Sequence, residues 1–222
     1  MIAEVNGIRL FYEKSGAGRP LVMVHGNGED HTIFDEAARE LRGEYCCYRL
    51  DSRCHGQSSD TAELHYRDMA TDVIAFLKAL DLKDVIFYGF SDGGIIGLMA
   101  AARCERITTL IVSGANTNPK AVKWWLRPVI AAGKLITKDK KLALVLNEPD
   151  ISDEELRQIR ASTLVLAGSG DLIPEKETRH IAGTIPGAEL QILKGENHGS
   201  YIVHSTKIAG LIRDFARDTG EA

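Results

Sequence analysis

Short apolar runs alternate with segments of helical periodicity along most of the chain. Several runs have the length and composition of buried strands: 21–24, 46–50, 85–87, 107–112, 163–167 and 189–193. Between them, apolar side chains recur every three or four residues, as on the helix face formed by Met69, Val73, Phe76, Leu77 and Leu80. Strands and helices in this order are typical of β-α-β crossovers. The pattern therefore predicts an α/β fold with a mostly parallel, twisted sheet and helices on both faces.

The N-terminal end has a different pattern. Two apolar runs, 2–5 and 8–12, are joined by Asn6-Gly7. Asn-Gly is the preferred pair for a two-residue turn between antiparallel strands, because both residues tolerate a positive φ. A β-hairpin is therefore expected at the N-terminus.

The segment 116–160 interrupts the alternation of strands and helices. It separates two predicted strands, is too long for a simple crossover, and contains two or three helical pieces. A chain of 222 residues is long enough for one full hydrophobic core. We therefore expect a single core made of 1–115 and 161–222, with 116–160 inserted as a short helical lid.

Local signals within this lid predict where its helices start. Pro128 restarts a helix, and a cap is expected at Thr137. Ser152 followed by Glu155 has the capping-box pattern. Four apolar residues at helical spacing are expected to face the pocket: Val122, Trp125, Leu126 and Val129. Trp125 is thus a candidate substrate contact.

Charge is distributed unevenly along the chain. The net charge is −4, whereas 118–147 contains seven Lys or Arg and one acidic residue, Asp139. An acidic chain gives no reason to expect nucleic acid as a partner. The basic lid has two interpretations that stay open: a solvated basic face over a packed apolar one, or a surface that draws anionic substrates or lipid head groups.

Overall composition is that of a globular chain, with 44% hydrophobic and 26% charged residues. The first residues lack the basic and apolar regions of a signal peptide, and the longest apolar stretch, near 95–102, is too short to span a bilayer. No metal-binding spacing connects the four cysteines, Cys46, Cys47, Cys54 and Cys104. We expect a cytoplasmic protein with reduced thiols, no metal site and no stable membrane insertion.

Ser91 lies in the stretch Gly89-Phe90-Ser91-Asp92-Gly93, between a predicted strand and a predicted helix. Gly-x-Ser-x-Gly in that context is the nucleophile elbow, a strained turn that raises a serine hydroxyl above the sheet. The two glycines leave room for the turn, since side chains there would collide. Ser91 is therefore the candidate nucleophile.

A nucleophilic serine needs a base, and the base needs an acid to orient it. His198 follows the strand predicted at 189–193, and Asp171 follows the strand predicted at 163–167. The carboxyl ends of parallel strands meet at one edge of a sheet, so both side chains are expected near Ser91. Their chain order (serine, aspartate, histidine) is that of hydrolases on this kind of fold. Ser91, Asp171 and His198 are therefore the candidate catalytic triad.

An acyl-transfer site also needs N–H donors for the oxyanion that develops on the carbonyl oxygen. Asp92 starts the helix after Ser91 and supplies one backbone N–H, and Asn27, in the turn 25–28, is expected to supply the other. The Asp92 carboxylate has two interpretations. It points away and only starts the helix, or it faces the pocket and favours a cationic group on the substrate.

With these motifs the chain resembles the α/β-hydrolase superfamily from end to end. The matching pieces are His25-Gly26-Asn27-Gly28, Asp51-Ser52-Arg53-Cys54-His55-Gly56-Gln57-Ser58, Gly89-Phe90-Ser91-Asp92-Gly93-Gly94, Gly168-Ser169-Gly170-Asp171 and Asn197-His198. The resemblance implies a triad of Ser91, His198 and Asp171, and an oxyanion hole formed by Asn27 and Asp92. Within the superfamily the chain is similar to small esterases, lactonases and aminopeptidases, including biphenyl-hydrolase-like esterases, which share the Ser-Asp-Gly-Gly elbow.

Two features depart from the family's pattern. Cys54 replaces a glycine that is usual in the loop 51–58, which leaves the path of that loop open. The lid is short, so it carries no inference about the substrate. We interpret Asp51, Arg53 and His55 as residues that brace the loop and take no part in catalysis.

These features together predict a cofactor-independent serine hydrolase with a small-molecule substrate. We expect it to cleave an ester-like bond, in a carboxylic ester, lactone, thioester or amide, through an acyl-enzyme on Ser91. Acyl transfer to another alcohol is a further reaction that the same residues support. The alternative is a ligand sensor or signalling protein on a hydrolase fold, with slow turnover or none. The acyl group, the leaving group and the oligomeric state stay open.

Overall fold

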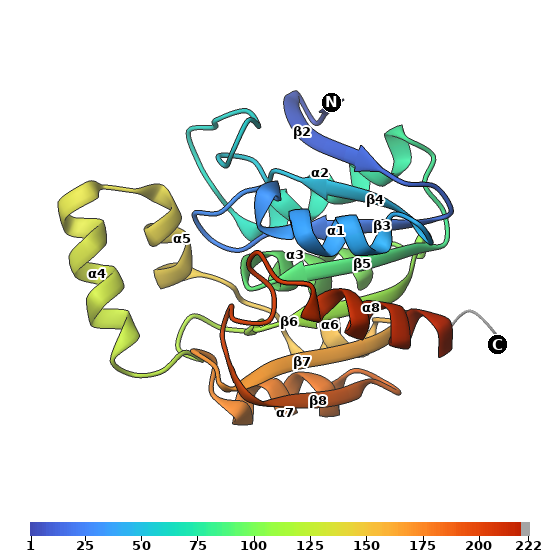
Figure 1. The fold of residues 1–222 in the computed structure, drawn as a ribbon. Coiled ribbons are helices and arrows are strands. Elements are labelled where there is room, and N and C mark those ends of the chain that lie inside the picture. The colour runs from blue at the N-terminus through green and yellow to red at the C-terminus, as the bar shows by residue number, and fades with distance from the viewer. Residues whose placement is uncertain (219–222) are drawn as a thin grey trace.

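One eight-stranded sheet, in the order β1-β2-β4-β3-β5-β6-β7-β8, runs through the molecule (Figure 1). The computed structural model describes residues 1–218. In chain order the strands are β1 (Ile2–Val5), β2 (Ile8–Ser15), β3 (Arg19–Val24), β4 (Tyr45–Leu50), β5 (Val85–Phe90), β6 (Ile107–Ser113), β7 (Ser162–Gly170) and β8 (Glu189–Asn197). All pairings from β4 to β8 are parallel, and β2 is antiparallel to both of its neighbours. The predicted mostly parallel sheet is confirmed.

The N-terminal hairpin is also confirmed. Strands β1 and β2 pair in a register that places Val5 opposite Ile8. The two residues between them have φ of 49° at Asn6 and 77° at Gly7. Positive φ at both central positions is the geometry of a type I′ turn, which matches the twist of the flanking strands.

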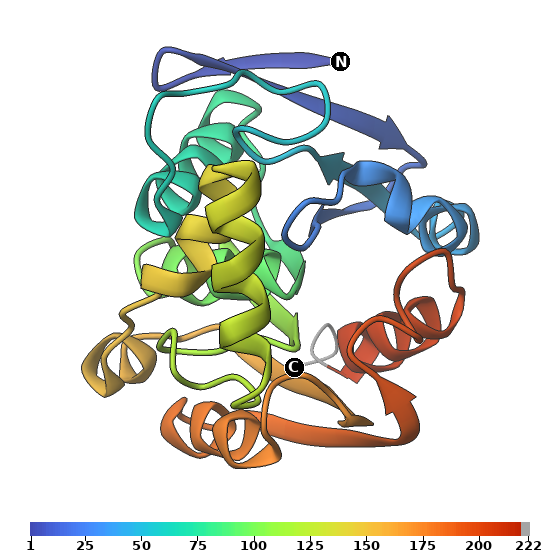
Figure 2. The same ribbon diagram turned by 90° about the vertical axis from the view of Figure 1, so that its left-hand side faces the viewer.

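Helices cover both faces of the sheet (Figures 1 and 2). One face packs against η1 (His31–Phe34), α1 (Asp35–Leu41) and α8 (Lys207–Asp218), and the other against α2 (Tyr66–Ala79), α3 (Asp92–Ala101), α6 (Asp153–Arg157) and α7 (Glu175–Thr184). Alternate residues of a strand pack into the two core layers, one on each face of the sheet. In β5, Val85 and Phe87 join the layer with α2 and α3, whereas Ile86 and Tyr88 join the layer with α1 and α8.

The segment expected as a lid divides into two parts. Helices α4 (Leu126–Thr137) and α5 (Lys140–Asn147) stand away from the sheet, side by side (Figures 1 and 2). The following helix, α6, returns to the core, where Ile151, Leu156 and Ile159 are buried in the layer with α2 and α3. The division of the chain into core and lid stays a prediction, and the part that stands apart is shorter than 116–160.

Three helix starts within this segment had sequence signals. Pro128 lies in the first turn of α4, which begins at Leu126. At Ser152 both hydrogen bonds of the capping box with Glu155 are present, as expected. The cap expected at Thr137 is wrong, because Thr137 ends α4 and the side chain of Asp139 accepts the N–H of Lys141 to start α5. Both residue types cap helices, so only the backbone path decided between them.

Candidate active site

Ser91 lies on a sharp turn between β5 and α3. Its φ of 53° and ψ of −113° are strained for a residue with a side chain. A Cβ at Gly89 would overlap the carbonyl of Gly93, and a Cβ at Gly93 would overlap the carbonyl of Val24. Glycine is therefore required on both sides, as the sequence pattern predicted.

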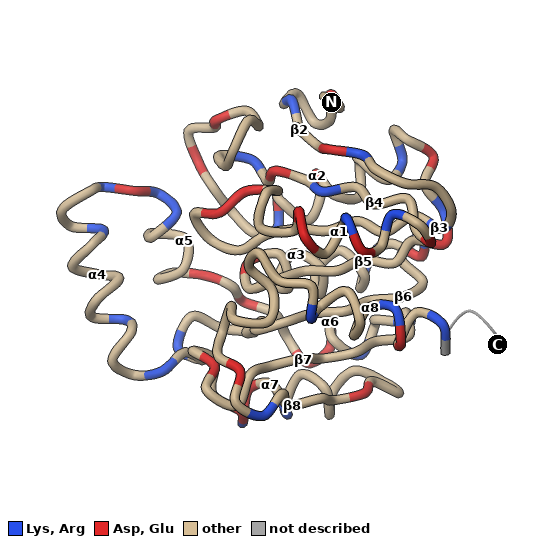
Figure 3. Tube along the Cα trace, in the orientation of Figure 1, with Lys and Arg blue, Asp and Glu red and all other residues tan. Residues whose placement is uncertain are grey.

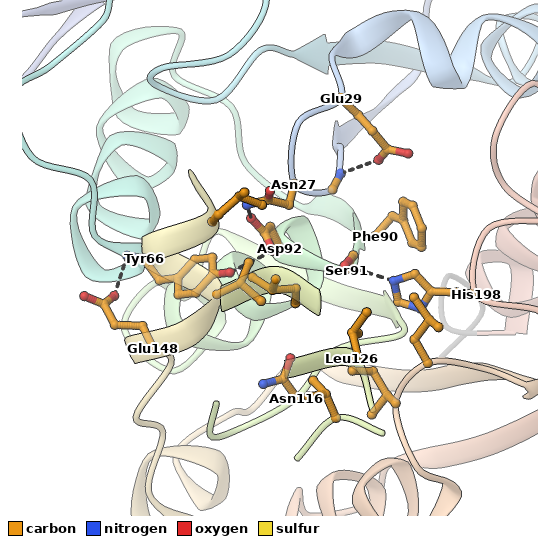
Figure 4. A pocket seen from close by; sticks show the side chains of 17 residues that line it. Asn27, Glu29, Tyr66, Phe90, Ser91, Asp92, Asn116, Leu126, Glu148 and His198 are labelled. Carbon is orange, nitrogen blue, oxygen red and sulfur yellow. Dashed lines mark hydrogen bonds between the residues drawn. The ribbon is translucent and has the colours of Figure 1, made fainter. Parts of the chain in front are cut away.

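His198 connects Ser91 to Asp171 through its two ring nitrogens. Its Nε2 lies 3.1 Å from Ser91 Oγ, and its Nδ1 lies 2.6 Å from Asp171 Oδ1. Asp171 is buried, and its Oδ1 also accepts the N–H of Ile173 at 2.9 Å. With Nδ1–H donated to Asp171, Nε2 is free to accept the proton of the serine. The three residues come from the carboxyl ends of β5, β7 and β8, and the structure brings them together. Figure 4 shows the contact between Ser91 and His198.

The turn after β3 lies against Ser91. The N–H of Gly26 is occupied, because it donates to Glu29 Oε2 at 2.9 Å. The side-chain amide of Asn27 donates to Asp92 Oδ2 at 2.9 Å and to the carbonyl of Lys141 at 3.2 Å. The group of Asn27 that remains for an oxyanion is therefore its backbone N–H. Asp92 is the first residue of α3, so its own N–H has no acceptor within the helix.

The Asp92 side chain does not point away from the pocket, and it does not present a free carboxylate to it either. It is buried in the pocket wall between Asn27 and Tyr66 (Figure 4). Its Oδ1 accepts the hydroxyl of Tyr66 at 2.7 Å, and its Oδ2 accepts the amide of Asn27. Burial raises the pKa of this carboxyl, and the hydrogen bonds from Tyr66 and Asn27 oppose the rise. Both oxygens of Asp92 therefore already have partners.

A cavity of about 270 Å³ opens over Ser91. Apolar side chains from α4, α5 and the segment before them form much of its wall: Val122, Leu126, Ile130, Leu142 and Val145. Of the residues expected to face the site, Val122 and Leu126 do so. Trp125 and Val129 lie outside the lining and are 44% and 61% exposed, which corrects the expected substrate contact at Trp125. One position along a helix is a turn of about 100°, so the neighbour of a lining residue points elsewhere.

Three carboxylates line the cavity, and the sequence analysis singled out only Asp92. The others are Glu29, in the turn after β3, and Glu148, directly after α5. Glu148 is occupied, because its oxygens accept from Nδ1 of His65 at 2.5 Å and from the N–H of Tyr66 at 3.0 Å. Glu29 has the bond from Gly26 on Oε2, and burial raises the pKa of its carboxyl. Within residues 1–218, Glu29 Oε1 has no hydrogen-bond partner.

Comparison with known proteins identifies the family of the chain. A family model described as alpha/beta hydrolase fold matches residues 19–132. The chain belongs to the α/β-hydrolase family. Its sequence is 27% identical over 260 residues to the AB hydrolase superfamily protein YisY of Bacillus subtilis, covering 94% of this chain and 96% of that protein. It is 24% identical over 244 residues to the serine hydrolase BPHL of Mus musculus, covering 95% and 84%.

Solved structures of α/β-hydrolases share the fold. The enol-lactonase from Burkholderia xenovorans LB400 superposes with a TM-score of 0.82 at 21% identity, over 98% of this chain and 100% of that chain. The esterase EaEST from Exiguobacterium antarcticum gives 0.83 at 20% identity, over 99% and 98%. Family membership and the names of these relatives support a hydrolase. At this identity the structures establish the fold alone.

The loop 51–58, which departs from the family's pattern at Cys54, keeps a glycine-like path. Cys54 has φ of 64°, in the left-handed region that glycine favours. Asp51 accepts the N–H groups of His31 and Gln57, each at 2.8 Å. Arg53 donates from Nε to Asp72 at 2.6 Å. These bonds agree with a bracing role, and the loop residues Asp51, Arg53 and His55 do not line the pocket of this hydrolase.

One cluster of the hydrolase has the spacing of metal ligands. Asp30, His31 and Asp51 each place a ligand atom within 4.8 Å of the others. His31 Nδ1 and Asp51 Oδ1 are 2.7 Å apart and hydrogen-bonded to each other, and Asp30 Oδ1 caps the N–H of Thr32. The carboxylate oxygens of Asp51 and Asp30 accept the N–H groups of His31 and Thr32, so these hydrogen bonds hold the loop 51–58 and Asp30 to η1 and give the cluster a structural role.

Proposed function

We propose that this α/β-hydrolase is a serine hydrolase that cleaves small ester-like substrates through an acyl-enzyme on Ser91. The observation that carries the proposal is the chain of contacts from Ser91 Oγ to His198 Nε2 and from His198 Nδ1 to Asp171 Oδ1. The strained turn at Ser91 supports it, because such strain persists where it positions a reacting group.

The first half of the reaction follows from these contacts. Ser91 Oγ forms a bond to the substrate carbonyl carbon while its proton passes to His198 Nε2, and the carbonyl electron pair moves onto the oxygen. The backbone N–H groups of Asn27 and Asp92 hold that oxyanion. When the carbonyl re-forms, the bond to the leaving group breaks, and the leaving group takes the proton from His198. Asp171 holds the imidazole in the tautomer that this transfer needs.

Water completes the cycle by the same route. It attacks the acyl carbon as His198 removes one proton, and the proton then returns to Ser91 Oγ as the acid leaves. No step requires a metal or a cofactor. The inner faces of α4 and α5 form the wall of the pocket, so we infer that these helices cover the bound substrate.

The charge of the pocket points to the class of substrate. Its lining contains Glu29, Asp92 and Glu148, and no Lys or Arg of residues 1–218. Asp92 and Glu148 are hydrogen-bonded on both oxygens, which leaves Glu29 as the carboxylate that a substrate meets. We therefore propose an uncharged or cationic substrate. The basic residues of 118–147 give no support to an anionic substrate, because none of them lines the pocket.

A fluorophosphonate probe tests the core of this proposal. It should label the wild-type protein and leave Ser91→Ala unlabelled, with Ser162→Ala, at an exposed serine, labelled as in wild type. Label retained on Ser91→Ala would refute the assignment. Turnover of p-nitrophenyl acetate then separates an enzyme from a ligand sensor, which would bind substrate analogues without hydrolysing them.

A further inference from the structure

Helix α4 has two apolar faces. The inner face, with Leu126 and Ile130, lines the pocket. The outer face consists of Trp124 just before the helix entry, Trp125, Val129, Leu135 and Ile136. Trp125, Val129 and Ile136 lie at spacings of four and seven residues, which is one stripe along the helix. An amphipathic helix has one apolar stripe, which it buries against the protein core. A second apolar stripe on α4 therefore indicates contact with something outside this chain.

The outer face is open to solvent. Trp124 is 85% exposed, and Leu135 and Ile136 are each 82% exposed. Besides Met1 and Ile2, these five side chains are all the large apolar groups that residues 1–218 expose. Exposed apolar groups gathered on one element mark a contact surface, whereas scattered ones do not.

Positive charge surrounds the same helix (Figure 3). The segment 118–147 has seven Lys or Arg against one acidic residue, Asp139. Arg127, Lys140 and Lys141 have hydrogen-bond partners within the protein. The side chains of the other four have none in the part of the chain that the structure describes: Lys120, Lys123, Lys134 and Lys138.

We propose that α4 docks its outer face into the head-group region of an anionic phospholipid bilayer. Tryptophan and aliphatic side chains beside lysines are the composition of helices that lie in a membrane interface. The unpaired lysines match anionic lipid head groups. A second copy of the chain is the less favoured occupant, because two such faces would bring like charges together. The inner face of the same helix lines the pocket, so docking places the pocket wall next to the lipid.

The two tryptophans of the chain both lie in this face, so tryptophan fluorescence, excited where tyrosine does not absorb, reports on it alone. Vesicles of phosphatidylcholine with phosphatidylglycerol should shift the emission to the blue and carry the protein into the pellet. We expect at least tenfold weaker partition into phosphatidylcholine alone, and a fall in binding as salt is raised. Ser91→Ala should bind as wild type does, so the result is independent of catalysis.

Variants locate the contact. Val129→Glu with Ile136→Glu should lower the partition at least tenfold, whereas Ile2→Glu, the same change at an exposed site outside this face, should leave it unchanged. Circular dichroism checks that each variant is folded. Lys134→Gln with Lys138→Gln provides a second test and should reduce the preference for phosphatidylglycerol. Equal binding by wild type and the Val129/Ile136 variant overturns the proposal. A second outcome would also overturn it. In that outcome the wild type forms a dimer in sedimentation equilibrium, the Val129/Ile136 variant does not, and the wild type fails to bind vesicles.

Discussion

Helices α3 and α4 both contain mostly apolar residues, yet the rest of the chain holds them very differently. Every residue of α3 is buried, whereas none of the residues of α4, all of which the structure describes, is buried. Helix α3 lies between the sheet and α2, and α4 touches mainly α5. Apolar content alone therefore does not make a helix part of a core.

The two helices contribute differently to the pocket: α3 helps to fix the position of Ser91, and α4 forms apolar wall. The turn before α3 is held by hydrogen bonds from Ser91 N–H to Ser113 and from Gly93 N–H to His25, at 2.8 and 3.0 Å. Such a scaffold fixes the atoms that react. Helix α4 supplies apolar wall, and few buried contacts hold it, as is usual for elements that open and close over a site.

The largest expected effect tests the α3 side of the comparison. Ser91→Ala and His198→Ala should each lower kcat by about 10⁴–10⁶, and the double variant by little more, because the residues act as a unit. Steady-state hydrolysis of p-nitrophenyl acetate measures this, with Ser162→Ala as the matched control. Additive losses in the double variant would show that the two side chains work separately.

The second prediction makes the same substitution in both helices. Leu98, in α3, is 1% exposed, and Leu135, in α4, is 82% exposed. Leu98→Ala should lower the free energy of unfolding by about 2–5 kcal/mol, through lost burial and the cavity left behind. Leu135→Ala should change it by no more than about 0.5 kcal/mol. Urea denaturation measures both, and similar losses would mean that α4 is packed against a partner in solution.

The third prediction concerns pH and the turn that holds Gly93. Burial lowers the pKa of His25 to about 4, from an ordinary value of 6.5. Its Nε2 accepts the N–H of Ser52 at 3.1 Å, so a proton there would also break this hydrogen bond. A lowered pKa means that the native state holds His25 neutral. The stability from this group is therefore complete above pH 6.5 and is lost as the pH falls toward 4, by up to about 3 kcal/mol.

Urea denaturation at pH 7 and pH 4.5 measures that loss. His25→Gln removes the titrating group, so its stability should depend less on pH over this window than that of wild type. Ser162→Ala, at an exposed serine, replaces no titrating group and is the control, which should keep the pH dependence of wild type. Identical pH dependence in His25→Gln and wild type would contradict the prediction.

The smallest expected effect concerns which region of the molecule interacts with a charge on the substrate. For a choline ester and its uncharged 3,3-dimethylbutyl counterpart, Glu29→Gln should lower the ratio of kcat/KM values by about tenfold. The gross attraction at about 5 Å and a dielectric constant near 20 is about 3 kcal/mol, of which solvent leaves roughly 1.4. Lys134→Gln, on α4, should leave the ratio unchanged. If Lys134→Gln changed the ratio as much as Glu29→Gln does, α4 would also discriminate between charged and uncharged substrates.

Sequence patterns predicted the core of the molecule better than they predicted the orientation of α4. The Asn6-Gly7 hairpin and the capping box at Ser152 depend on neighbours along the chain, and both were found. The gathering of Ser91, Asp171 and His198 was expected because parallel strands deliver their ends to one edge. Trp125 was expected in the pocket and lies outside it, because helical spacing shows which residues share a face and not which way the face points.

By itself, the sequence determined the alternation of strands and helices, the strained turn at Ser91 and the order of the three candidate catalytic residues. Those features depend on periodicity and on glycine at fixed distances, which are local properties of a chain. Only the tertiary structure decided which carboxylate is free. Asp92 is next to Ser91 in the sequence, but its carboxylate oxygens accept hydrogen bonds from Tyr66 and Asn27. Glu29 is 62 positions from Ser91, and within residues 1–218 its Oε1 has no hydrogen-bond partner. Hydrogen bonds between distant segments exist only after the segments have packed together, so no local pattern contains them.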